Sequence, residues 1–482
     1  MRKNPCVIFV YLSALSLSAL SAVGQRTKEE IIKQIDAGEA AYSAIALKIW
    51  DYAEVGYHET KSSALLQEHF KKEGFKVDVG VAAIPTAFIA SYGSGHPIIG
   101  ILGEFDALPG VAQEAVPELK PIPGQVAGHA CGHHLFGTAS MEAAVAVKNW
   151  MIATGQKGTI RFYGTPAEEG GSGKVYMVRA GLFDDVDTVL QWHAGDRNEV
   201  RMGSTLANKS GKFRFHGVAS HAAAAPERGR SALDGVESMD YMVNMMREHV
   251  PETTRIHYVI THGGEAPNVV PAFAEVYYYV RSPSRDIVKD VWSRVEKAAN
   301  GAALGTGTTV DWEITGGAYE LLSNETLGRV MHKNLEAVGG VNYTPAEKAF
   351  AEKIGRTLPG GKPAVLELAS MVAPFSNFSS VGNASTDAAD VSWTVPTMGL
   401  VAATWVPGTP AHSWQAVAAG GTGIGLKGMQ VAAKTLALTA TDLFTQPEVV
   451  AQAKAEFLKR RGADFKYEPM VGNRAPALDY RN

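Results

Sequence analysis

Side chains that can bind a divalent metal ion occur in five short clusters along the chain. In chain order the clusters are Glu104 with Asp106, His129 with Cys131 and His133, Glu168 with Glu169, His193, and His412. Thiolate, imidazole and carboxylate groups together suit zinc, manganese or a similar divalent ion. The chemistry that these residue types could support is metal-assisted hydrolysis.

The adjacent pair Glu168-Glu169 indicates two different roles. On an irregular loop neighbouring side chains point in different directions, so one carboxylate could bind metal while the other moves protons. Each residue type alone has a more common role than metal binding. An isolated Glu-Glu pair is more often a solvated acidic turn, and a lone histidine is more often an ordinary polar residue. A lone cysteine such as Cys131 is more often inert and buried. The joint placement of all the clusters after predicted strands or at a helix start favours metal binding.

Short apolar runs that precede the clusters predict strands of one sheet. These runs are residues 97–102, 159–163, 188–191 and 399–403. In a parallel sheet the loops after the carboxyl ends of the strands converge at one edge. A helix predicted over Ala139–Ala153 follows the cluster around Cys131. The expected fold class is α/β, a mostly parallel catalytic domain with helices on both faces.

Residues 209–316 show a different pattern, in the order β-α-β-β-α-β, which predicts a ferredoxin-like α+β domain inserted into the catalytic domain. The catalytic domain is then discontinuous, with parts at 25–208 and 317–482. The last twenty residues, with Pro469, Pro476 and many polar groups, are typical of a surface tail.

Residues 1–24 have a basic start, an apolar stretch and small residues before Gln25, a pattern typical of a cleaved signal peptide. The alternative is an uncleaved anchor, but the apolar stretch is shorter than the ~20 residues that a span needs. We therefore expect a periplasmic or extracellular protein without a stable membrane span. The formal net charge of −4 and the absence of a basic run make nucleic acid an unexpected partner.

Seven motifs together resemble the metal-dependent aminoacylase, carboxypeptidase and amidohydrolase family, and most closely its branch of auxin-conjugate amidohydrolases and aminobenzoyl-glutamate hydrolase B subunits. The motifs are Asp106-Ala-Leu-Pro109, His129-Ala-Cys-Gly-His133, Pro166-Ala-Glu-Glu169, Trp192-His193, Gly217-Val-Ala-Ser-His221, Pro267-Asn-Val-Val-Pro271 and His412-Ser413. They follow one another in order over nearly the whole chain. Singly they are modest signals, and jointly they are specific.

The resemblance implies two divalent ions per chain, zinc or manganese, with Cys131 bridging them. The ligands that it implies are Cys131, His133, Glu169, His193 and His412. It makes Glu168 the general base, while Asp106 orients a ligand imidazole or, alternatively, caps the turn before Pro109. One departure is His134, where many relatives have Asp. Asp387 lies in a segment similar to the aminobenzoyl-glutamate branch and is given no role.

The resemblance also makes the inserted domain a lid and dimerisation domain. It implies that His221 polarises the scissile carbonyl, in some relatives from the partner chain, and that Asn268 and Arg281 hold the substrate. A guanidinium is well suited to gripping a carboxylate. Without the resemblance, His221 would be a turn residue, Asn268 a turn cap and Arg281 a solvated strand end.

The expected function is hydrolysis of the amide bond in N-acyl amino acids that carry a carboxylate, such as p-aminobenzoyl-glutamate-like conjugates, by a homodimer formed through the lid. A broad dipeptidase or aminoacylase is the alternative within the same chemistry. A catalytically silent subunit that needs a partner chain is the alternative outside it, and the presence of every expected ligand and the base argues against it.

Overall fold

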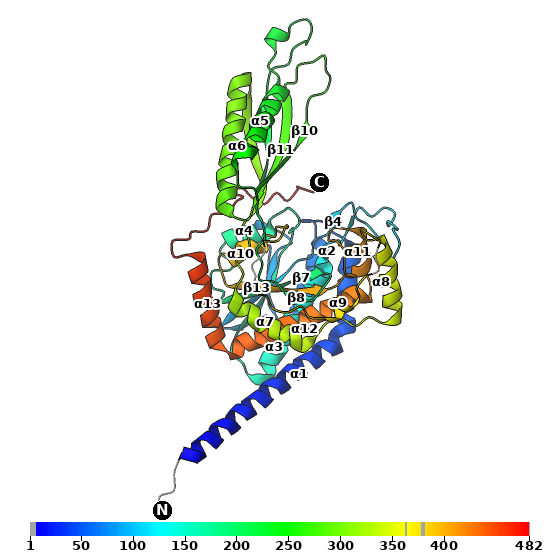
Figure 1. Ribbon diagram of the computed structural model, residues 1–482, viewed down its shortest axis with the longest axis vertical. Coiled ribbons are helices and arrows are strands. Elements are labelled where there is room, and N and C mark those ends of the chain that lie inside the picture. Colours follow the sequence, from blue (N-terminus) through cyan, green and yellow to red (C-terminus); the bar gives the residue numbers. More distant parts are fainter. Residues whose placement is uncertain (1–5, 362–363, 377–380, 482) are drawn as a thin grey trace, which may run out of the picture.

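The computed structural model describes residues 6–481 apart from 362–363 and 377–380. It has two bodies, a catalytic domain and a lid domain that extends from it (Figure 1). Each body has its own hydrophobic core, one built from the segments on both sides of the lid and one from the lid itself. The chain therefore folds as a discontinuous domain with an inserted one.

A seven-stranded sheet in the order β1-β2-β6-β3-β7-β13-β8 forms the centre of the catalytic domain. The four strands from β6 to β13 are parallel, whereas β1, β2 and β8 pair antiparallel. Every residue of β3 is buried, so both faces of the sheet are covered. The strands are β1 (Lys76–Val79), β2 (Phe88–Ser94), β3 (Ile98–Gly103), β6 (Gly158–Gly164), β7 (Thr188–Gly195), β8 (Glu199–Val200) and β13 (Thr397–Ala403).

Long helices cover the sheet. The helices α3 (His133–Thr154) and α12 (Gly423–Thr445) pack on its strands and on each other, and α1 (Cys6–Tyr52) packs against both. Both α3 and α12 are rich in alanine and other small apolar residues, which lets them pack closely in the core. The remaining helices of this domain are α2 (Thr60–Lys72), α4 (Gly173–Arg179), α7 (Glu325–Val338), α8 (Pro345–Thr357), α9 (Glu367–Ser370), α10 (Ala388–Ser392), α11 (Trp414–Gly420) and α13 (Pro447–Arg461).

The lid domain is a four-stranded antiparallel sheet in the order β10-β11-β9-β12, with α5 and α6 packed on it. Along β11 buried residues alternate with partly exposed ones, as expected for a sheet with one covered face. Its elements are β9 (Ala207–His216), α5 (Ala232–Met246), β10 (Arg255–His262), β11 (Phe273–Ser282), α6 (Arg285–Thr306) and β12 (Thr309–Ala318). The short elements η1 (Val81–Ala83), β4 (Leu108–Pro109), β5 (Ala127–Gly128), η2 (Pro226–Arg228) and η3 (Arg247–His249) complete the structure.

Three local expectations need correction. The helix α3 begins at His133 rather than Ala139, because Gly132, with a φ of 77°, starts a first turn whose histidines are buried. The strand β7 continues to Gly195, so His193 lies within it. The expected surface tail needs only a partial correction, because residues 463–481 are mostly exposed or half-buried but Met470 and Val471 are buried. Within the part of the chain that the structure describes, no helix has both the length and the apolar character for crossing a bilayer.

Candidate metal centre

The candidate metal ligands meet at the carboxyl end of the parallel strands. The strand β3 leads to Glu104 and Asp106, and β6 leads to Glu168 and Glu169. These two loops start side by side because Gly103 and Gly164 pair in register. The strand β7 carries His193, the loop after β13 carries His412, and the start of α3 carries Cys131 and His133. The parallel register thus brings together residues that are distant in the sequence.

Three overlapping groups of side chains have their ligand atoms within 4.8 Å of one another. The groups are Cys131, His133 and His193; Cys131, Glu169 and His412; and His133, Glu168 and Glu169. All five residues expected to bind metal therefore lie in one cluster. Cys131 belongs to two of the groups, so its thiolate lies where a ligand could bridge two ions.

Hydrogen bonds orient the ring of His193. Its Nδ1 lies 2.8 Å from the carbonyl oxygen of Ala194, to which it donates in the corresponding tautomer, and its Nε2 lies 3.4 Å from Cys131 Sγ. The lone pair on Nε2 is then directed into the cluster. On the other side of Cys131, His412 Nε2 lies 3.1 Å from Glu169 Oε1.

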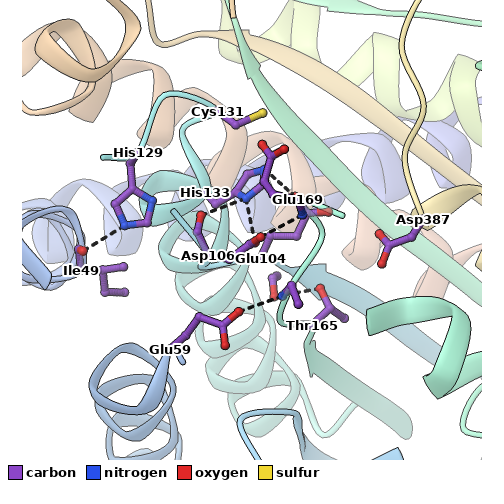
Figure 2. Close-up of polar contacts among 12 residues, drawn as sticks. Ile49, Glu59, Glu104, Asp106, His129, Cys131, His133, Thr165, Glu169 and Asp387 are labelled. Atoms are coloured by element: carbon purple, nitrogen blue, oxygen red, sulfur yellow. Dashed lines mark hydrogen bonds and ion pairs between the residues drawn. The ribbon is translucent and has the colours of Figure 1, made fainter. Parts of the chain in front are cut away.

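Two carboxylates flank the ring of His133 (Figure 2). Nδ1 lies 2.9 Å from Asp106 Oδ1, and Nε2 lies 3.0 Å from Glu104 Oε2. The second oxygen of Asp106 accepts a hydrogen bond of 2.9 Å from the backbone N–H of Glu169. Burial opposes ionisation of Asp106, but His133 and these hydrogen bonds outweigh it and lower its pKa to about 2. Asp106 thus connects two candidate ligands, as a residue that orients an imidazole should.

The site contains buried polar atoms that are suited to a cation. Within the described residues, His133 Nε2, Glu104 Oε2 and Glu169 Oε1 are buried and have only the ion-pair contacts given above, without a hydrogen bond. Burial, and then the charge of Glu169, raises the pKa of Glu168 well above its usual value. Burial also raises the pKa of Cys131. Buried acids without a counter-charge are costly, and a thiolate, imidazoles and carboxylates fit divalent metal ions that would compensate them.

A buried lysine lies behind the cluster, and sequence reasoning missed it. Lys174 Nζ lies 2.7 Å from Glu104 Oε1 and 2.6 Å from Asp387 Oδ1. The backbone N–H of Lys174 also donates to Asp387 Oδ2 over 2.8 Å. Although burial opposes the charge, Asp387 and Glu104 raise the pKa of Lys174. Two features of the sequence could have indicated this ion pair. Lys174 follows Glu168-Glu169 closely, and Glu104 comes directly after a predicted strand.

Two further buried residues, His134 and Glu59, contact backbone groups. His134 is buried, and its Nε2 lies 3.1 Å from the carbonyl oxygen of Gly420. Glu59, which sequence reasoning also missed, accepts a hydrogen bond of 2.8 Å from the backbone N–H of Ala167. Burial and then the charge of Asp106 raise the pKa of Glu59 to about 8.

The backbone is strained on both sides of the cluster. Ala167, directly before Glu168, has a φ of 56°, and His412 has a φ of 60°. Residues other than glycine rarely adopt this conformation, which costs about 1–3 kcal/mol and persists where surrounding contacts enforce it. The loop that carries Glu168 and Glu169 is therefore held in place rather than relaxed.

The three lid residues expected at the site lie at different ends of the lid. Arg281 is near the end of β11 closest to the catalytic domain, where its guanidinium lies 4.6 Å from the centre of the Tyr279 ring. His221 and Asn268 are exposed and lie together beyond the opposite end of the sheet, where the backbone N–H of Ala222 donates to the carbonyl of Asn268. A ten-residue strand such as β9 spans roughly 30 Å. The far end of the lid points away from the catalytic domain (Figure 1). With the length of the lid strands, this places His221 and Asn268 far from the metal cluster of their own chain.

Comparisons with known proteins agree with this architecture. The peptidase dimerisation domain of the M20 family matches residues 207–306. The chain is 42% identical over 468 residues to the B subunit of p-aminobenzoyl-glutamate hydrolase from Escherichia coli, covering 92% of this chain and 97% of the relative. It is 32% identical to an indole-3-acetyl-aspartic acid hydrolase of Enterobacter agglomerans, over 41% of this chain and 45% of that protein.

Solved structures show the same fold. An aminobenzoyl-glutamate utilization protein from Klebsiella pneumoniae superposes with a TM-score of 0.61 at 18% identity, covering 87% of this chain and 99% of the other. A dinuclear metal-binding peptidase of the M20 family from Bacillus subtilis superposes with a TM-score of 0.58 at 15% identity, covering 85% and 99%. With the relative that is 42% identical over nearly its full length, these findings show that the chain belongs to the M20 family of metallopeptidases and amidohydrolases.

Proposed function

We propose that this protein hydrolyses the amide bond of N-acyl amino acids, with p-aminobenzoyl-glutamate-like conjugates as the leading substrates. The observation that carries the proposal is the cluster in which two groups of candidate ligands share Cys131 and a third contains Glu168. The names of the relatives support the substrate class, since one belongs to a p-aminobenzoyl-glutamate hydrolase and another hydrolyses indole-3-acetyl-aspartic acid. Both compounds join an acyl group to an acidic amino acid.

Two divalent ions, zinc or manganese, would be held by Cys131, His133, Glu169, His193 and His412. When bound, such ions polarise a carbonyl and lower the pKa of water. Asp106 keeps the ring of His133 in one orientation through its Nδ1, and the carbonyl of Ala194 does the same for His193.

The side chain of Glu168 is the proton carrier in this proposal. Its carboxylate takes a proton from the attacking water and passes it to the nitrogen of the departing amine. Burial, and next the charge of Glu169, raises the pKa of Glu168, which makes its carboxylate a stronger base for accepting the proton of water. The hydrogen bond that the backbone N–H of Ala167 donates to Glu59 holds the backbone next to it.

The lid residues would act from two chains. Arg281 is close enough to the catalytic domain to grip a substrate carboxylate in its own chain, whereas His221 and Asn268 would reach the site of a partner. We propose a homodimer formed through the lid, in agreement with the peptidase dimerisation domain found there. Association with a different chain is the alternative, because the Escherichia coli hydrolase also has an A subunit, to which this chain is 29% identical.

A broad dipeptidase is the second candidate function. The chain is 28% identical over 445 residues to an Xaa-Arg dipeptidase of Mus musculus, a match that covers 89% of this chain. The same ligands and the same base would serve that reaction. The third candidate is a catalytically silent subunit, and the complete set of clustered ligands argues against it.

The test is release of free amino acid from N-acyl amino acids, dipeptides and p-aminobenzoyl-glutamate by purified protein reconstituted with manganese or zinc. We expect p-aminobenzoyl-glutamate to be among the best substrates, and activity to disappear with a chelator. Glu168→Gln should abolish turnover and still bind both metals, because only the proton carrier is lost. A fully active Glu168→Gln variant would contradict the mechanism, and a preference for dipeptides would favour the second candidate.

We also propose that the protein is exported to the periplasm or the extracellular space after cleavage near Gly24. The proposal rests on the basic and apolar pattern of residues 1–24. In the structure residues 6–24 belong to α1, whose first part extends away from the catalytic domain (Figure 1). N-terminal sequencing of protein from fractionated cells tests it, and a cytoplasmic protein that retains residues 1–24 would contradict it.

A further inference from the structure

A segment of the chain that the proposed mechanism does not use ends at the candidate metal centre. It comprises Pro469–Arg481 and is called the tail strap below. After α13 the chain crosses between the two domains, and its end lies at their junction (Figure 1). Sequence reasoning assigned it to the surface, yet Met470 and Val471 are buried.

The tip of the tail strap binds the backbone of a candidate metal ligand. Tyr480 Oη donates a hydrogen bond of 3.0 Å to the carbonyl oxygen of Glu169. Arg481 Nη2 donates to the same oxygen over 2.5 Å. A carbonyl oxygen has two lone pairs, so the two donors together satisfy it. A bond from a charged guanidinium is stronger than one between neutral groups.

The same tip packs against neighbouring parts of the loop. The rings of Tyr480 and Tyr57 meet edge to face with their centroids 5.5 Å apart, and Tyr57 Oη donates to the carbonyl of Gly171 over 2.6 Å. At Gly56 an added Cβ would lie 2.2 Å from Tyr480 Oη and 2.9 Å from Ala167 Cα. The tip therefore fills the space beside the strained residue that precedes Glu168.

Two arginines anchor the middle of the tail strap. Arg179 Nη1, at the end of α4, donates to the carbonyls of Gly472 and Arg474 over 2.8 and 2.7 Å. Arg474 Nη2 in turn donates to Glu313 Oε1 on the lid strand β12 over 2.6 Å. Because the middle is fixed to both domains, the tip has a defined position at the loop.

We propose that the tail strap is a positioning element of the active site, in which Tyr480 and Arg481 hold the Glu169 carbonyl and thereby aim the side chains of Glu168 and Glu169. The strained backbone at Ala167 needs surrounding contacts to persist. Glu59 binds its N–H, and the tail strap adds two hydrogen bonds two residues further on, at the carbonyl of Glu169. This inference rests on the proposed function for its catalytic consequence. Its structural consequence, a fixed ligand loop, holds for any substrate.

The experiment compares the Tyr480→Phe/Arg481→Met double variant with Asp479→Asn, a matched control at an exposed neighbour. Three properties are measured on full-length protein: amide hydrogen exchange of residues 165–172, retention of manganese or zinc against a chelator, and kcat and KM. We expect faster exchange confined to that loop, faster metal loss, and kcat lower by about tenfold to a hundredfold with little change in KM. The Tyr480→Phe/Arg481→Lys variant, which keeps a charged donor at position 481, should lose less than the Tyr480→Phe/Arg481→Met variant.

A double variant that matches Asp479→Asn in exchange and metal retention overturns the inference. If exchange rises throughout the protein, the single variants Tyr480→Phe and Arg481→Met are measured in the same way, and an unchanged loop in both also overturns it. If no substrate is found, the exchange and metal measurements still decide the positioning role, so failure of the proposed function is distinguishable from failure of this inference.

Discussion

The catalytic domain and the lid domain differ in how completely one chain assembles their candidate site residues. In the catalytic domain, ligands from four separate segments lie within 4.8 Å in overlapping groups. In the lid, Arg281 lies close to the catalytic domain, but His221 and Asn268 are exposed at the far end of the lid sheet, whose strand β9 is ten residues long. The difference shows that one folded chain brings the candidate metal ligands together but leaves His221 and Asn268 away from them. In the proposed dimer, the second chain would supply these two residues.

The largest expected effect comes from Cys131, one of the residues shared by two ligand groups. Cys131→Ala should lower activity by at least about 1,000-fold and leave little of either metal bound, because both groups lose a ligand. His412→Ala removes a member of one group only and should retain about one metal per chain. Metal content measured by mass spectrometry, with the exposed lid residue His257→Ala as control, distinguishes the two variants. Equal metal content in Cys131→Ala and wild type would show that the thiol is not a ligand.

The next effect tests the need for a second chain. His221→Ala should lower kcat by about 100-fold to 1,000-fold, as loss of an oxyanion-stabilising donor does. When His221→Ala and Glu168→Gln chains are mixed and exchange freely, half of the dimers are mixed and each has one intact site, so about a quarter of wild-type activity should return. Recovery is measured after co-expression of differently tagged chains. If the mixture stays as inactive as its parents, His221 does not act across the dimer.

A smaller effect is expected at the lid residue nearest the catalytic domain. Arg281→Met should raise KM about tenfold to a hundredfold for substrates with a carboxylate, because a hydrogen-bonded charge pair is lost. The KM of Arg281→Lys should lie between those of wild type and Arg281→Met, since lysine keeps the charge but not the bidentate geometry. Steady-state kinetics with a carboxylate substrate and its amide analogue measure the difference. An equal rise in KM for both substrates would show that Arg281 does not recognise the carboxylate.

The smallest effect concerns stability, and it compares the two cores. Burial raises the pKa of Glu142 in α3 to about 8, and that of Asp240 in α5 to about 6. A carboxyl group whose folded pKa is raised stabilises the fold most when protonated, so this contribution is lost as pH rises from the unfolded pKa through the folded one. For Glu142 the loss extends from pH 4.5 to about 8, and for Asp240 it extends from pH 3.8 to about 6.

Glu142→Gln should therefore be more stable than wild type at pH 8.5, by on the order of a few kcal/mol, and similar to it near pH 4.5. Asp240→Asn should reach its full difference already near pH 7. Urea unfolding of the metal-free proteins at several pH values measures both differences. A constant difference between Glu142→Gln and wild type across this range would contradict the raised pKa.

Motifs made of neighbouring residues were accessible to sequence reasoning. Cys131 and His133 are two residues apart and precede a predicted helix, whereas the adjacent Glu168 and Glu169 follow an apolar run that predicts a strand. The parallel sheet then required these motifs to meet at one edge. The start of α3 was misplaced because its first turn is polar in sequence, and only its burial in the fold shows that His133 begins a helix.

The sequence by itself determined the family, the α/β architecture with an inserted lid, and the residue types gathered for metal chemistry, because motif order and periodicity are local properties of the chain. Only the tertiary structure decided that Lys174 pairs with Asp387, 213 residues away, and that Tyr480 binds the backbone of Glu169, 311 residues away. Such contacts depend on how loops pack once the core is formed. Neither periodicity nor composition encodes that packing, since it arises from burial and hydrogen-bond satisfaction among segments that meet only in the folded protein.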